Sequence, residues 1–84
     1  MVTTQVTVVN QLGMHARAAA KFVHLANRFA ARVKVSRQGR EMDGKSILGL
    51  LLLAAARGSL ITITADGSDE LAAAEALARL VSEG

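Results

Sequence analysis

Apolar residues change their spacing along the chain from every second position to helical spacing and back. The first eight residues alternate in this way and predict a half-buried strand, whose β-branched face consists of Val2, Thr4, Val6 and Val8. The segment from Asn10 to Gly13 breaks the alternation, and from about Ala16 the pattern becomes helical. This helical segment carries one apolar stripe, made of Ala19, Phe22, Val23, Ala26 and Phe29 or Ala30.

The middle of the chain predicts a hairpin followed by a short helix. Val33 and Val35 alternate with polar residues in a second strand, Gln38-Gly39 forms the turn, and a third strand covers residues 40–43. Residues 46–55 then predict a buried helix, because Ser46 is a good N-cap and leucine favours helices. We expect Gly58 to end this segment, and Leu50, Leu52 and Leu53 to lie in the core.

The last third of the chain predicts a strand, a turn and a helix. Alternation returns at residues 61–65, and Asp66-Gly67 follows as a turn. Ser68 is the expected N-cap of the final helix, and Asp69 and Glu70 complement the positive end of its dipole. The residues that we expect this helix to bury are Leu71, Ala74, Leu77 or Ala78, and Val81.

The order β-α-β-β-α-β-α predicts an α+β fold, an open sandwich in which helices cover the one apolar face of four strands. A length of 84 residues suits a single domain over residues 1–84, and a hydrophobic content of 51% suits the core that so short a chain needs.

Composition excludes several classes of protein. The chain has no cysteine, so disulfides, thiolate nucleophiles and cysteine-based metal sites are absent, and we expect neither a metal nor a cofactor. The longest apolar run, residues 50–56, is far below the ~18–20 residues that span a bilayer. The first ten residues lack the pattern of a signal peptide, so we expect a soluble cytoplasmic protein without membrane insertion.

Charge is distributed unevenly along the chain. Residues 1–40 contain seven basic residues and no acidic residue, whereas residues 41–84 contain three basic and seven acidic residues. A basic half is typical of proteins with an anionic partner, although a solvated basic surface explains it equally well.

The two histidines differ in position. His24 lies inside the first predicted helix with no carboxylate one turn away, as expected for a surface histidine. His15 directly precedes that helix, where free N–H groups and the helix dipole favour a neutral ring and would stabilise an attached anion. Arg17 can contact phosphate oxygens, and Gly13 permits a close backbone approach. This pattern suits a histidine that accepts and releases a phosphoryl group, but it also fits a loop histidine without chemistry.

Three segments resemble the HPr family, the histidine-containing phosphocarriers of the bacterial phosphoenolpyruvate:sugar phosphotransferase system. NQLGMHARAAAKFV is similar to the active-site segment of that family, and GKSILGLLLLAA is similar to the segment around its regulatory serine. LITITADGSDELAAAEAL is similar to its last strand, turn and helix. The resemblance covers nearly the whole chain and implies an open-faced β-sandwich, a four-stranded antiparallel sheet with three helices on one face.

The resemblance implies a phosphoryl carrier rather than a stand-alone enzyme. His15 would accept the phosphoryl group on Nδ1, and Arg17 would contact the phosphate. Enzyme I would be the donor and an EIIA domain the acceptor in sugar uptake. The chain departs from the family where Ala18 replaces the usual proline and where His24 and Asn27 replace lysines.

Ser46 has two compatible interpretations. Its hydroxyl caps a helix, and the resemblance adds regulatory phosphorylation by HPr kinase/phosphorylase in some bacteria. Beside it we expect an exposed apolar patch for partner docking, formed by Met14, Ile47, Leu48 and Leu51. Its expected basic rim consists of Arg17, Lys21 and Lys45.

Other functions were weighed against the carrier. A nucleic-acid-binding module is disfavoured because Phe22 and Phe29 are the only aromatic residues and both fall on the first predicted helix, so no strand offers an aromatic side chain for base stacking. A nitrogen-related carrier of the same family, with a regulatory output, is the main alternative. In either case we expect a monomer.

Overall fold

The computed structural model describes residues 1–83 and contains seven elements in the predicted order. The strands are β1 (Val2–Thr7), β2 (Arg32–Arg37), β3 (Arg40–Asp43) and β4 (Leu60–Asp66). The helices are α1 (Ala16–Ala26), α2 (Ile47–Leu52) and α3 (Glu70–Glu83). None of these helices is long and apolar enough to cross a membrane, within the 83 residues described.

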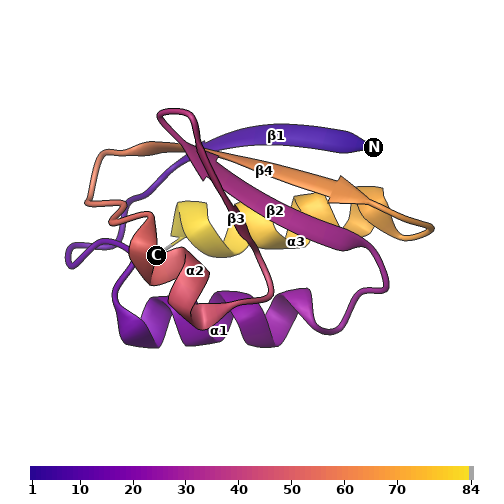
Figure 1. The fold of residues 1–84 in the computed structure, drawn as a ribbon, viewed down its shortest axis with the longest axis horizontal. Coiled ribbons are helices and arrows are strands. Elements are labelled where there is room, and N and C mark those ends of the chain that lie inside the picture. Colours follow the sequence, from indigo (N-terminus) through magenta and orange to yellow (C-terminus); the bar gives the residue numbers. More distant parts are fainter. Residues whose placement is uncertain (84) are drawn as a thin grey trace.

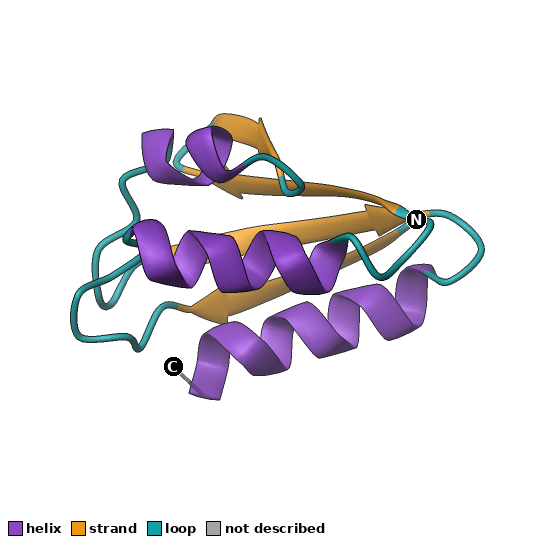
Figure 2. Cartoon of the chain, turned by 90° about the horizontal axis from the view of Figure 1, so that it is seen from below, coloured by secondary structure: helices purple, strands orange, loops and turns teal. Residues whose placement is uncertain are grey.

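The four strands form one antiparallel sheet in the order β1-β4-β2-β3 (Figure 1). The register places Val6 opposite Ile61 and Val35 opposite Ile63, so the apolar residues of neighbouring strands share a face. All three helices lie on that face, and the other face is open (Figure 2). The predicted α+β open sandwich is therefore confirmed.

The core lies between the sheet and the helices. Phe22 of α1 and Leu77 of α3 are fully buried, as are Leu50 and Leu53 from α2 and its C-cap. The strands contribute the largest side chains of their inner face, namely Val35, Ile61 and Ile63. Burying an aliphatic or aromatic side chain of this size contributes roughly 1.5–3 kcal/mol, so these contacts hold the helices on the sheet.

Helix α2 is shorter than the sequence predicts. It ends at Leu52, with Leu53 as its C-cap, because Ala54 adopts a left-handed conformation with φ of +52°. Gly58, which was expected to end the helix, lies four residues further on. Leu52, the last residue of the helix, has 52% of its surface exposed, so the prediction that it is a core residue is wrong.

The start of α3 also differs from the prediction. Asp69, not Ser68, precedes the helix, and its carbonyl accepts the first helical hydrogen bond from Ala73 N. The carboxylate of Asp69 accepts hydrogen bonds of 2.8 Å from Ala30 N and Ala31 N, and the bond from Ala30 lowers the pKa of this carboxyl.

The buried face of α3 was predicted correctly at Ala74, Leu77 and Val81 but not at its first turn. Leu71 is 59% exposed, and Ala73 is buried in its place. The smaller side chain fits because this end of the sandwich is packed from alanines, Ala31 and Ala65 among them.

The β2–β3 hairpin has the predicted turn. Gln38 and Gly39 adopt φ values of +50° and +83°, so both central residues are left-handed. This is the type I′ geometry that matches the twist of the strands, and it directs Arg37 and Arg40 to the two ends of the turn.

Candidate functional site

The loop between β1 and α1 is a compact turn held by Asn10. The Asn10 side-chain oxygen accepts a hydrogen bond from Leu12 N at 3.0 Å, and its carbonyl accepts one from Gly13 N at 2.8 Å. Asparagine favours such turns because its side chain bonds to the backbone two residues on. The sequence predicts that the first strand ends in this segment, but the two hydrogen bonds by which Asn10 stabilises the turn are found only in the structure.

The same loop is fastened to the chain that follows α2. Met14 N donates a hydrogen bond of 2.8 Å to the carbonyl of Ala55. Gly13 has φ of +70°, and a Cβ placed on it would lie 2.7 Å from Ala55 O and 2.9 Å from Ala56 Cα. Both the conformation and the space therefore require glycine at position 13.

His15 is the N-cap of α1. Its backbone is extended, with φ of −82° and ψ of 179°, and its carbonyl accepts the first helical bond, from Ala19 N. Its Nδ1 accepts a hydrogen bond from Arg17 N at 3.3 Å. In the neutral ring the proton is therefore on Nε2, and the lone pair of Nδ1 points at the start of the helix.

The surroundings of His15 favour an anion. The first turn of α1 contains no acidic residue, and its backbone N–H groups lie at the positive end of the helix dipole. Arg17 is exposed, and no ion pair formed by residues 1–83 involves it. Lys21 is also exposed, one turn further along the helix. A phosphate on Nδ1 would thus stand at the positive end of the helix, beside backbone donors and with no carboxylate in the first turn.

His24 lies outside this arrangement. It is exposed in the last turn of α1, nine residues after His15. That separation corresponds to roughly 13 Å along a helix axis, too far for the two rings to act on one phosphate. The structure thus keeps the two histidines apart.

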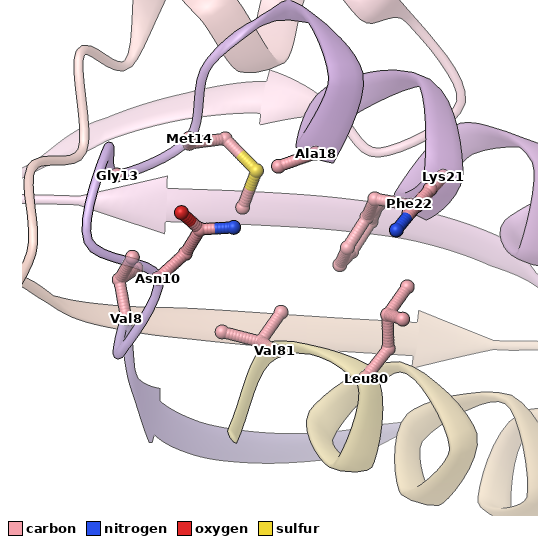
Figure 3. Close-up of a pocket in the computed structure, with 9 residues that line it drawn as sticks. All are labelled: Val8, Asn10, Gly13, Met14, Ala18, Lys21, Phe22, Leu80 and Val81. Carbon is pink, nitrogen blue, oxygen red and sulfur yellow. The ribbon is translucent and has the colours of Figure 1, made fainter. Parts of the chain in front are cut away.

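Met14 is buried, contrary to the expectation that it belongs to an exposed patch. It is only 9% exposed and points into a small cavity of about 40 Å³ between the start of α1 and the end of α3 (Figure 3). The cavity walls include Ala18 and Phe22 from α1 and Leu80 and Val81 from α3. Met14 packs inward because its backbone N–H is held by Ala55, which fixes the loop against the core.

Ser46 is the N-cap of α2, as predicted. Its Oγ accepts a hydrogen bond of 3.0 Å from Gly49 N, and the residue is half-buried. Gly49 permits this approach, because a Cβ there would lie 3.3 Å from Ser46 Oγ.

Helix α2 exposes an apolar surface beside Ser46. Ile47, Leu48 and Leu51 are exposed as expected, with Leu48 67% exposed. Leu52 joins them, and Met14 does not. We call the exposed set Ile47, Leu48, Leu51 and Leu52 the α2 apolar surface.

Three basic residues near this surface donate hydrogen bonds to backbone carbonyls. The ammonium group of Lys45 donates a hydrogen bond of 2.8 Å to the carbonyl of Phe29, so this group is engaged with the loop after α1. Arg37 and Arg40, which the sequence did not single out, donate hydrogen bonds to carbonyls at the other end of α2. Within the 83 described residues, no group of three potential ligands could hold a metal ion.

Comparison with known proteins identifies the family. The model described as the phosphorylation site of the HPr component of the phosphotransferase system (PTS) matches residues 2–83. The phosphocarrier protein HPr of Cupriavidus necator is 48% identical over 98% of this chain and 92% of its own length. The crystal structure of HPr from Bacillus anthracis superimposes with a TM-score of 0.92 at 46% identity over 95% of each chain. HPr-C-His from Thermoanaerobacter tengcongensis gives a TM-score of 0.93 at 33% identity, covering 96% of this chain and 91% of its own. The chain therefore belongs to the HPr family of phosphocarrier proteins of the PTS.

Proposed function

We propose that this protein carries a phosphoryl group on Nδ1 of His15. The observation that supports this most directly is the hydrogen bond from Arg17 N to Nδ1, which directs the nitrogen lone pair at the N-terminus of α1. An N–H donor at that position can shift to a phosphate oxygen once Nδ1 forms a bond to phosphorus. The exposed guanidinium of Arg17, two residues after His15, would supply a second set of donors to the phosphate.

The transfer step is a displacement at phosphorus. The lone pair of Nδ1 forms a new N–P bond, while the bond from phosphorus to the donor breaks and the donor keeps that electron pair. Charge on the three peripheral oxygens is then stabilised by the first-turn amides and by Arg17. The same groups stabilise the oxygens during release, when an acceptor displaces His15. Modest stabilisation suits a carrier, because tight binding of the phosphate would slow the second transfer.

The proposed donor is enzyme I and the proposed acceptor is an EIIA domain, in sugar uptake by the PTS in the cytoplasm. Membership of the HPr family supports both partners. The α2 apolar surface and the exposed Arg17 and Lys21 offer them an apolar contact with cationic neighbours. We propose that the protein acts as a monomer and that its chemistry uses no cofactor.

We also propose Ser46 as a second, regulatory phosphorylation site, modified by HPr kinase/phosphorylase with ATP. A phosphate there would stand at the start of α2, directly before Ile47 and Leu48 of the α2 apolar surface. Added negative charge at that place would weaken docking of an acidic partner.

Incubation with phosphoenolpyruvate and enzyme I tests the main proposal. We expect intact-mass measurement to show one added phosphate that is labile in acid and stable in base. His15→Ala should eliminate it, because no other imidazole lies at a helix N-terminus. His24→Ala is the matched control and should be phosphorylated at the wild-type rate. A phosphate on His15→Ala, or its loss in His24→Ala, would overturn the assignment.

A further inference from the structure

Two arginines of the β2–β3 hairpin contact the C-terminal end of α2. Nη1 of Arg40 donates a hydrogen bond of 3.1 Å to Leu52 O, and Nη1 of Arg37 donates one of 3.2 Å to Leu53 O. The two donors stand on either side of the hairpin turn, and the two acceptors are successive residues. The hairpin thus holds the end of a helix that is distant in sequence.

Helix α2 needs such support. It is six residues long and has no basic residue in its own last turn. A helix this short is unstable on its own, and its final carbonyls lie at the negative end of the dipole. The carbonyls of Leu50 and Leu51 accept bonds from Leu53 N and Ala54 N. The next two carbonyls are the ones that the arginines contact, before the chain turns away at Ala54.

The same short segment also supports the loop that carries His15. Ala55, directly after the left-handed Ala54, accepts the hydrogen bond from Met14 N. The hairpin, α2 and the His15 loop therefore meet at residues 52–55. Leu48, Leu51 and Leu52 project into solvent from the helix that ends there.

We propose that Arg37 and Arg40 are positioning residues that hold the C-terminal end of α2 and so fix the α2 apolar surface for partner docking. This inference rests on the proposed function, in which that surface receives enzyme I and EIIA. We expect docking to depend on the two arginines more than the phosphoryl step does, because their hydrogen bonds go to α2 and the bond to Nδ1 of His15 comes from Arg17. A separate bond, from Met14 N to Ala55 O, holds the His15 loop.

Positioning can be separated from simple attraction by salt. A positive charge that only steers an acidic partner loses its effect at about 0.5 M salt, where the Debye length is roughly 4 Å. The hydrogen bonds to Leu52 and Leu53 are local contacts, so their effect on α2 persists there. Arg40→Gln removes the guanidinium, and Arg40→Lys keeps a cation that can reach a carbonyl. Arg79→Gln removes the same charge from an exposed position on α3 and is the matched control.

The experiment combines amide hydrogen exchange with transfer kinetics from phospho-enzyme I. In Arg40→Gln we expect exchange at the amides of Leu53 and Ala54 to rise about threefold to tenfold. KM for the carrier should rise by about the same factor at 0.5 M salt, because the same opening of α2 weakens docking, with kcat within about twofold. Arg40→Lys should recover part of both effects, and Arg79→Gln should leave exchange in α2 unchanged.

Unchanged exchange in Arg40→Gln would overturn the proposal, since the arginine would then not hold α2. Faster exchange with an unchanged KM at 0.5 M salt would also overturn it, because the end of α2 would not matter for docking. Failure of enzyme I to phosphorylate the wild-type chain would instead reject the proposed function. The exchange measurement needs no partner, so the two failures are distinguishable.

Discussion

Helices α1 and α2 both begin at a residue whose side chain accepts a hydrogen bond from the first turn, but the two caps differ in strength. At α2, Ser46 Oγ accepts from Gly49 N at 3.0 Å, with the residue type and spacing of a standard N-cap. At α1, His15 Nδ1 accepts from Arg17 N at 3.3 Å, a longer bond with a nitrogen acceptor. Histidine is not a preferred cap, so position 15 holds a residue that serves helix stability poorly.

The loops before the two caps differ in charge as well. Asp43 precedes Ser46, and its carboxylate and carbonyl accept hydrogen bonds from Lys45 N and Ser46 N. The turn before His15 is built on the neutral Asn10 and Gly13. The first turn of each helix has one N–H bonded by its cap residue, Gly49 N at α2 and Arg17 N at α1. The two starts therefore differ in the charge of the preceding loop: the carboxylate of Asp43 stands before α2, whereas the turn before α1 has no carboxylate.

The largest expected effect on stability comes from Gly13→Ala, which breaks the support of the His15 loop. A Cβ would collide with Ala55 O and Ala56 Cα, and the φ of +70° disfavours alanine. Strain plus overpacking should lower the free energy of unfolding by about 2–3 kcal/mol. Denaturant unfolding would measure the loss, and phosphorylation from enzyme I should slow with it.

Gly58→Ala is the matched control for this variant. Its φ of +89° is also left-handed, but a Cβ there would meet no atom within 4 Å. Gly58→Ala should lower the free energy of unfolding by about 1 kcal/mol, because only the left-handed conformation disfavours alanine there. If both variants lost the same free energy of unfolding, the close approach of Gly13 to Ala55 and Ala56 would not contribute to stability.

Ser46→Ala tests the stronger cap. Loss of the bond to Gly49 N should lower the free energy of unfolding by about 1 kcal/mol. Ser68→Ala is the control, because α3 starts after Asp69 and a change at Ser68 should be nearly neutral.

With ATP and HPr kinase/phosphorylase, the wild-type chain should gain a phosphate that Ser46→Ala lacks. A wild-type chain that stays unmodified would leave Ser46 with the capping role alone.

His15→Asp has the smallest expected effect on stability and the opposite sign. Aspartate caps helices better than imidazole and complements the dipole, so we expect the free energy of unfolding to rise by about 0.5 kcal/mol. Phosphohistidine formation should be lost at the same time. His24→Asp places the same change in the last turn of α1, where a negative charge is unfavourable, and should lower stability. A loss of stability in His15→Asp would contradict the view that His15 is a weak cap.

Local patterns in the sequence predict much of this molecule. Alternation and helical spacing place β1, α1, β2, β4 and α3, because each of these turns an apolar face toward the core. The Gln38-Gly39 turn places β3, and the N-cap Ser46 with the leucines after it places α2. The starts of α1 and α2 follow from residues next to them, the break at Gly13 and the N-cap Ser46. For the same reason, His15 and Ser46 are both found at helix starts, where the sequence places them.

The errors arise where distant segments decide the local structure. The early end of α2 depends on Ala54 taking a left-handed conformation, which glycine usually adopts and which alanine gives no reason to expect. Met14 is buried in a loop that is fastened to Ala55, a residue 41 positions further along the chain. The contacts of Arg37 and Arg40 with α2 have no signature in either segment.

The hydrogen bond between Met14 N and Ala55 O also bears on the order of events during folding. It joins two loops that are far apart in the sequence, and contacts of that kind form late in folding because chain entropy opposes them. The His15 loop therefore reaches its final shape only after the chain has been made and folded beyond α2. A nascent or partly unfolded molecule would lack the docked loop, so under the proposed function we expect it to accept a phosphoryl group more slowly than the folded chain.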